Sequence, residues 1–296
     1  MRQLFSIGKV IQIRTDPLNV KKLAFVETEE HIRHVVEMLK WLYPFVGGVL
    51  CRATELHDIG KKICLRSDFA RNRRRGNKWL AESYLREDFY GRQVKGQFTV
   101  SDAIAGYLSF LEQGMHVKSF VMRQNPQDDT SQSVAVRYQL DPPFGNHAAS
   151  VERDDLQDIP DDKGDYIHSL IQLHHNFQVD KLVAAAAQHG EDIIADLYRL
   201  MTADQEGSRW AEYVVQKLEY GMEGPQSKFG FSEFAIEAIS EPGEVSRDGK
   251  KVQGQVTLKA IRRRDLGERT LKVDYYVSDC DLSKFTSAKK KGTRKR

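Results

Sequence analysis

The chain has 296 residues, of which 40% are hydrophobic and 29% are charged, and its formal net charge at pH 7 is +3. These values are typical of a globular protein with one large domain or two small ones, and no run of about 18 apolar residues predicts a membrane span. The amino terminus lacks the apolar core and cleavage site of a secretory signal, and the three cysteines lack Cys-x-x-Cys spacing. We therefore expect a cytoplasmic protein with no disulfide framework, no thiolate zinc site and no membrane association.

The predicted elements begin with strands and continue with helices. Apolar residues alternate over positions 1–27 and are interrupted at Thr15-Asp16-Pro17, which predicts a small β-hairpin. From Thr28, which suits a helix N-cap, the pattern becomes helical, with Val35 and Leu39 on one face. Further helices are predicted at about 47–58, 77–89, 101–115, 144–153, 165–176, 179–188 and 190–221.

Strand-like patterns return in the middle and at the end of the chain. The segment 118–143 is extended or loop-like, with its best strand at 134–140. Beyond Gly224-Pro225, alternating runs at 252–261 and 270–277 predict a small β appendage. The expected fold is therefore mainly α, with one domain at 1–225 that includes the hairpin and an insert at about 64–143. The β appendage with a basic tail occupies 226–296.

The adjacent pair His57-Asp58 ends a mostly apolar segment and is the most informative feature of the sequence. An imidazole and a carboxylate are costly to bury unless a cation satisfies both, and a metal ion does so directly. An isolated pair is equally compatible with a structural role. Further nitrogen and oxygen donors, numerous enough for two metal ions, are spread along the chain at His31, His147, His174, His175 and Asp204.

Asp204 is unusual because it falls within an apolar stripe. In the helix predicted at 190–221, Ile193, Leu197 and Leu200 lie on one face, and Asp204 continues that face where a leucine is expected. A buried carboxylate is normally paired, protonated or bound to a metal. The alternatives for Asp204 are therefore metal ligation and an ion pair with an arginine of the core.

The other histidines are less distinctive one by one. Both His174 and His175 can reach one metal cluster only near a helix end, and Asn176 supplies a plausible end. Their alternative roles are capping of helix carbonyls and exposure to solvent. His147 alone is compatible with a structural role, and His31 lies beside the apolar stripe of the helix that begins at Thr28.

Taken in order, these residues resemble a known superfamily. The series His31, His57-Asp58-Ile59-Gly60-Lys61, His147, His174-His175 and Ala203-Asp204 resembles the HD metal-dependent phosphohydrolases over about 30–220. More narrowly, the histidine doublet resembles that of the stand-alone HD nuclease of type I CRISPR systems, which cuts single-stranded DNA beside a helicase. The resemblance implies an HD-domain helical bundle.

The resemblance also implies roles for the donors. One metal ion would be held by His31, His57, Asp58 and Asp204, and a second by Asp58, His147, His174 and His175. Asp58 would bridge the two ions, and Lys61 would neutralise phosphate charge, although it is equally compatible with a surface lysine. Because imidazole-rich sites favour transition metals over magnesium, we expect two divalent ions of manganese, nickel, cobalt, iron or zinc.

His147 lies 90 positions after His57, and the segment between them includes a basic cluster followed by aromatic residues. This composition suits single-stranded nucleic acid, whose phosphates pair with cations and whose bases stack. The alternative is a solvated loop beside the core of an inserted helix. The cations of the cluster are Arg71, Arg73, Arg74 and Arg75, and a second cluster lies at 289–296.

The sequence supports three functional hypotheses. The leading one is a metal-dependent endonuclease of single-stranded DNA, or also of RNA, in CRISPR antiviral defence. Because the chain lacks a Gly-x-x-x-x-Gly-Lys-Ser/Thr motif, we expect a separate ATP-dependent helicase and the CRISPR surveillance complex as partners. The second is an HD phosphohydrolase of a small nucleotide, such as a cyclic dinucleotide or dNTP. The third is a catalytically idle scaffold that binds nucleic acid.

Overall fold

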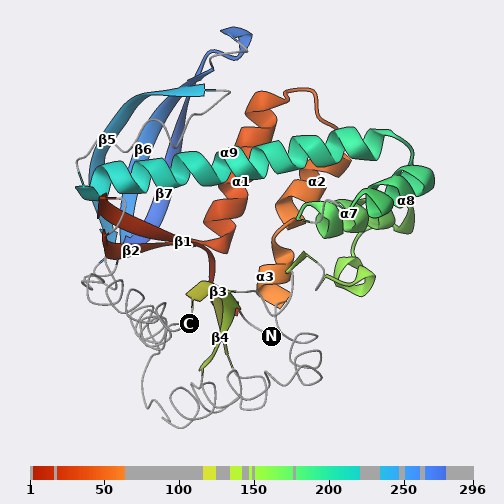
Figure 1. Cartoon of the computed structure of the whole chain (residues 1–296), viewed down its shortest axis with the longest axis horizontal. Coiled ribbons are helices and arrows are strands. Elements are labelled where there is room, and N and C mark those ends of the chain that lie inside the picture. The colour runs from red at the N-terminus through yellow and green to blue at the C-terminus, as the bar shows by residue number, and fades with distance from the viewer. Residues whose placement is uncertain are drawn as a thin grey trace, which may run out of the picture. The chain divides into compact units, whose positions relative to one another are not determined.

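The computed structural model of the chain (Figure 1) describes residues 3–16, 19–63, 116–124, 134–141, 147–148, 151–175, 178–220, 234–246, 251–260 and 264–277. Two compact units are present. The sheet unit comprises Met1–Glu30, Arg92–Pro142 and Arg209–Arg296, and the helical unit comprises His31–Gly91 and Pro143–Ser208. This division differs from the expected domain at 1–225 with an appendage at 226–296, because the first strands of the chain belong with the last ones.

The sheet unit contains seven antiparallel strands in the order β4-β3-β1-β2-β7-β6-β5. β1 and β2 form the predicted amino-terminal hairpin, with Val10 opposite Phe25. A short 3₁₀ helix, Arg264–Leu266, precedes the last strand. The strands are β1 (Gln3–Asp16), β2 (Asn19–Glu27), β3 (His116–Gln124), β4 (Val134–Asp141), β5 (Phe234–Ser246), β6 (Lys251–Ala260) and β7 (Glu268–Val277).

The β regions expected near the two ends of the chain are joined in this one sheet. β2 pairs with β7, with Ala24 opposite Val277 and Phe25 opposite Tyr276. The Tyr276 hydroxyl donates a 3.0 Å hydrogen bond to Glu27, 249 positions away in the sequence. The predicted presence of β structure near both ends is confirmed, but the carboxyl-terminal strands are part of a larger sheet and not a separate appendage.

The last turns of α9 (Asp192–Tyr220) pack on this sheet. A Cβ atom placed on Gly254 of β6 would overlap Leu218 and would approach Val214 to 3.2 Å, so glycine permits the close contact. The Tyr275 hydroxyl donates a 2.9 Å hydrogen bond to Glu219. Burial of these apolar side chains stabilises the packing of helix on sheet.

The described helices of the helical unit agree with most of the predicted ones. The predicted helix at 47–58 ends at Leu56 and is followed by a turn at His57 and Asp58. The one predicted at 144–153 is not an α-helix at its described residues, where His147 is in a turn, Ala148 is 3₁₀ and a second 3₁₀ helix starts at Arg153. The helices predicted at 77–89 and 101–115 lie outside the described residues. The helical elements are α1 (Thr28–Leu42), α2 (Gly48–Leu56), α3 (Ile59–Ile63), η3 (Arg153–Leu156), α7 (Asp161–Leu173), α8 (Val179–His189) and α9.

A close crossing of α1 and α9 brings two distant parts of the sequence together. A Cβ atom on Gly207 would lie 3.2 Å from the backbone nitrogen of Val35, which is tighter than ordinary contact. His31 lies one turn before Val35, and Asp204 lies one turn before Gly207. Because residues one turn apart share a helix face, the crossing places His31 beside Asp204.

The predicted apolar stripe of α9 is confirmed in the helical unit, where Ile193, Leu197 and Leu200 are buried. Helix α8 ends at Gly190, whose φ of 88° is a conformation that glycine adopts without strain. Among the residues that the structure describes, no helix has both the length and the apolar character needed to cross a membrane.

Candidate metal centre

All seven donors predicted from the sequence lie in the helical unit and converge there. Their ligand atoms form two groups, and within each group the atoms lie within 4.8 Å of one another. His31 comes from α1, His57 and Asp58 from the turn between α2 and α3, and Asp204 from α9. The first group is His31, His57 and Asp204, and the second is Asp58, His147, His174 and His175.

Asp58 lies between the two groups. Its Oδ2 atom is 3.2 Å from His31 Nε2 and 3.6 Å from His57 Nε2, whereas its Oδ1 atom is 2.9 Å from His147 Nε2. Asp204 Oδ1 completes the first group at 3.2 Å from His31 Nε2 and 3.8 Å from His57 Nε2. Ligands bonded to one cation at 2.0–2.2 Å are roughly 2.8–3.6 Å apart, so most of these separations match coordination of a shared ion.

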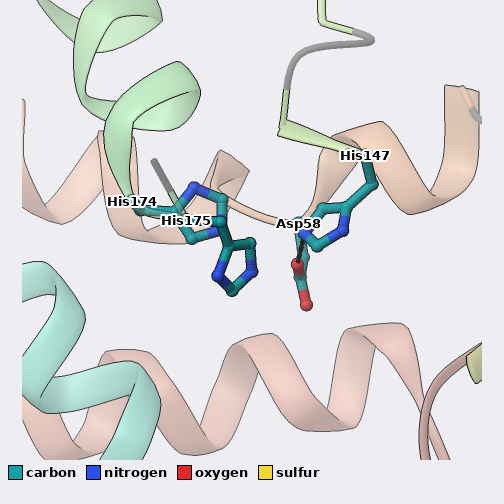
Figure 2. Close-up of side chains that lie close together, drawn as sticks. All are labelled: Asp58, His147, His174 and His175. Atoms are coloured by element: carbon teal, nitrogen blue, oxygen red, sulfur yellow. Dashed lines mark ion pairs between the residues drawn. The ribbon is translucent and has the colours of Figure 1, made fainter. Parts of the chain in front are cut away.

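The second group gathers three imidazoles around the other side of Asp58 (Figure 2). The two rings of the doublet extend from the end of α7 toward the Asp58 carboxylate and the ring of His147. The ring centroids of His147 and His175 are 4.8 Å apart, and those of His174 and His175 are 4.0 Å apart. Because α7 ends at Leu173 with His174 as its C-cap, the tandem histidines lie at the helix end, where both rings reach the same cluster.

Helix ends fix the tautomers of two donors. His57 follows α2, and its Nδ1 lies 2.7 Å from the Thr54 carbonyl oxygen. His174 follows α7 in the same way and donates from Nδ1 to the Ile171 carbonyl. These carbonyls belong to the last helical turn and lack intrahelical partners. Since each Nδ1 carries the hydrogen, each Nε2 offers a lone pair to a metal ion.

The donors fit a metal ion because several of their polar atoms are buried without a hydrogen bond. Nε2 of His57, His147 and His174 are all of this kind, although Asp58 lies within 4 Å of the first two. The side chain of Asp58 is only 1% exposed. Buried polar atoms are otherwise costly, and one cation in each group would satisfy them together.

The electrostatics around Asp58 and the histidine doublet favour the protonation states that metal binding requires. Burial raises the pKa of Asp58, but the Lys61 charge and the neighbouring imidazoles, which include hydrogen bonds from His147 and His31, outweigh it and hold that pKa well below its usual range. Burial and neighbouring imidazoles lower the pKa of His174, and those same causes lower that of His175 to about 4. At neutral pH the carboxylate is therefore charged and the doublet is neutral.

The shortest contact within the first group is between His31 Nε2 and Asp204 Oδ1. Burial lowers the pKa of His31, but hydrogen bonds to Asp204 and Asp58 raise it above its usual value overall. Burial raises the pKa of Asp204, and the hydrogen bond with His31 reverses that effect and holds it below its usual range. Within the described residues the ion pairs of Asp204 are with histidines, so an arginine partner is not what holds it.

Gly60 and Lys61, which follow Asp58 in the sequence, also make contacts at the donor cluster. The Lys61 ammonium donates to Asp58 Oδ2, and the Lys61 side chain is 13% exposed, so Lys61 lies at the donor cluster and not on the open surface. A Cβ atom on Gly60 would overlap the carbonyl oxygen of His147. Sequence reasoning missed this role of Gly60, for which the only signal was a glycine next to the donor pair.

The residues predicted to contact nucleic acid are not among those that the structure describes. Arg71, Arg73, Arg74 and Arg75 lie outside the described residues, as does the basic tail at 289–296. Sequence reasoning also missed the two carbonyl partners, Thr54 and Ile171, because a backbone acceptor leaves no mark on residue type.

No protein-family model matches the chain, and neither a search of curated proteins nor one of solved structures gives a match. The resemblance to the HD superfamily therefore depends on the order of the donors in the sequence. The geometry of the two donor groups is an independent observation.

Proposed function

We propose that this chain is a metal-dependent nuclease of the HD type that hydrolyses phosphodiester bonds of single-stranded DNA. The observation that carries the proposal is the position of Asp58 between the two donor groups, with Oδ2 3.2 Å from His31 and Oδ1 2.9 Å from His147, since a bridging carboxylate is what a two-metal hydrolytic site needs. The likeness in donor order to the CRISPR nuclease supplies the substrate class.

The donor set suits two transition-metal ions. Five imidazoles and two carboxylates favour manganese, iron, cobalt, nickel or zinc over magnesium, which prefers oxygen ligands. When bound, two such ions activate water and neutralise the charge that develops on a phosphodiester. His31, His57, Asp58 and Asp204 would hold one ion, and Asp58 with His147, His174 and His175 would hold the other.

The charge of the loaded site suits an anionic substrate. Two divalent ions held by two carboxylates and neutral imidazoles keep about two positive charges, and Lys61 adds a third. His175 is exposed in its group, and the Asp204 side chain is 19% exposed, whereas Asp58 is almost inaccessible. A phosphate would therefore approach along the His175 and Asp204 edge, with Lys61 holding the bridging carboxylate in its charged form.

A polymeric substrate is favoured by the basic cluster at 71–75 and the aromatic residues that follow it. Because the sequence lacks the phosphate-binding loop of ATP-driven motors, we propose that a separate helicase supplies unwound DNA in CRISPR defence. RNA is a further substrate to test with the same assay.

The experiment incubates the purified chain with circular single-stranded DNA and manganese, nickel or cobalt. We expect cleavage by the wild type and a loss of more than about 100-fold in Asp58→Ala and Asp204→Asn, because the first removes a direct ligand and the second replaces a charged carboxylate ligand by a neutral amide. The matched control is Asp196→Asn, since Asp196 lies on the same helix with a 20% exposed side chain but bonds to Tyr166 and Arg199.

The other functional hypotheses predict different results. Turnover of a cyclic dinucleotide or dNTP without cleavage of DNA would replace the nuclease by a nucleotide phosphohydrolase. Bound metal with no turnover of any phosphodiester would leave a scaffold. Equal activity of Asp204→Asn and Asp196→Asn would show that Asp204 is not a ligand.

A further inference from the structure

The turn that carries His147 is held from two sides. Ala148 and Val151 are buried, and the Val151 amide donates a 3.4 Å hydrogen bond to the Ala148 carbonyl. On one side, Gly60 lies against the His147 carbonyl, and a Cβ atom there would also approach the Val151 side chain to 3.2 Å. This contact ties the turn to the element that follows Asp58.

On the other side, α7 holds the turn through His168. Its Nε2 lies 2.9 Å from the Val151 carbonyl oxygen, and Nε2 of Gln172 lies 3.3 Å from the same oxygen. Because a carbonyl only accepts, the bond to Val151 needs the hydrogen on His168 Nε2, and Gln172 Nε2, 3.0 Å from that nitrogen, then donates to the carbonyl and not to His168. Helix α7 therefore ends in the His174 and His175 donors and also grips the segment that presents His147.

We propose that His168 is a positioning residue for the second metal ion. It acts through Val151, by fixing the turn that aims His147 Nε2 at Asp58 Oδ1, and it is not itself a ligand. The proposal rests on the proposed function in one respect, namely that His147 ligates the second ion. Its geometric basis, the bonds to Val151, is independent of any metal.

The size of the effect follows from the kind of contact that is lost. Removing the His168 donor leaves the Val151 carbonyl with the longer Gln172 bond, so the turn gains freedom and His147 is no longer held at 2.9 Å from Asp58. Loss of such an outer contact typically lowers metal affinity 10–100-fold. The first ion should keep its affinity, because three of its donors, His31, His57 and Asp204, have no contact with this turn that the structure records. The fourth, Asp58, contacts His147 but is also held by Lys61.

The experiment compares Co²⁺ binding by the full chain and its variants, using calorimetry and visible absorption. We expect two ions in the wild type. In His168→Leu we expect one unchanged ion and one that binds about 10–100-fold more weakly. His168→Gln should restore most of the affinity, since its amide can donate to the same carbonyl. The double variant His147→Ala/His168→Leu should bind no more weakly than His147→Ala alone.

A matched control and a metal-free measurement separate positioning from general destabilisation. His189→Leu removes another histidine bond to α7, a 3.0 Å contact with Ser169 Oγ that lies away from the turn, and should leave both ions unchanged. In metal-free protein, hydrogen exchange of the Val151 amide should speed up in His168→Leu but not in His189→Leu.

The outcomes distinguish this inference from the proposed function. Absence of bound Co²⁺ in the wild type would overturn both, whereas two ions of unchanged affinity in His168→Leu would overturn only the positioning role. Equal weakening of both ions, or failure of His168→Gln to restore affinity in a folded protein, would also overturn it. If His168→Leu does not fold, Gln172→Leu is used, with the same selective but smaller loss expected.

Discussion

Imidazoles with lowered pKa values tie the stability of the metal-free protein to pH. Burial lowers the pKa of His147, together with Lys61 and His57. Burial and neighbouring rings lower the pKa of His174, and they lower that of His175 to about 4 from an ordinary value of 6.5. Below pH 6.5 the unfolded chain therefore binds more protons at these positions than the folded chain, so stability falls as pH falls.

We accordingly predict that the melting temperature of the metal-free protein drops between pH 6.5 and pH 4. His31 does not offset this fall. Because its pKa is raised in the folded state, its contribution to stability is fully present below pH 6.5 and does not grow further as the pH falls. Differential scanning calorimetry in chelator checks the prediction, and His175→Gln should show a shallower drop. A melting temperature that stays constant over this range would contradict it.

At the scale of one element, the short helix α3 follows Asp58 directly and contacts the turn that carries His147. Gly60 is its second residue, and there a Cβ atom would overlap backbone atoms of His147 that cannot rotate away. We predict that Gly60→Ala costs about 1–3 kcal/mol in the free energy of unfolding, because overpacking a rigid contact forces a backbone shift.

Urea unfolding of metal-free protein measures this cost. The matched control is Gly48→Ala at the start of α2, where a Cβ atom meets nothing within 4 Å and alanine should be neutral or slightly stabilising. Equal effects of the two substitutions would show that Gly60 is not needed for the contact with the His147 turn.

At the scale of the whole molecule, a bound metal ion should stabilise the folded state of the helical unit. The donors come from segments as far apart in the sequence as α1 and α9, so an ion connects elements that are otherwise held by packing. An ion at 100 times its dissociation constant would add about 2.7 kcal/mol.

We therefore predict a melting temperature that rises with manganese or cobalt concentration and falls again with chelator. The rise should be absent in Asp58→Ala, which lacks the carboxylate that lies between the two groups, and preserved in Asp196→Asn. A similar rise in Asp58→Ala would mean that the ions bind elsewhere on the chain.

The sequence by itself determined which residues can act as donors, their order and most of the described helices. Apolar periodicity and residue chemistry are local properties, so α1, α8 and α9 were predicted closely, and Asp204 was recognised by its place on a buried stripe. The helix predicted at 144–153 was wrong because the turn there is set by Gly60 and α7, which are distant in sequence.

Only the tertiary structure decided how the donors divide into two groups, that His168 grips the His147 turn, and that strands from both ends of the chain share one sheet. These features depend on pairings such as β2 with β7 and on close backbone approaches such as Gly207 to Val35. Every residue has a backbone carbonyl, so the residue type at a position does not reveal which carbonyl accepts a hydrogen bond. Long-range strand register is set by the packing of the whole chain. Neither can therefore be predicted from a local sequence pattern.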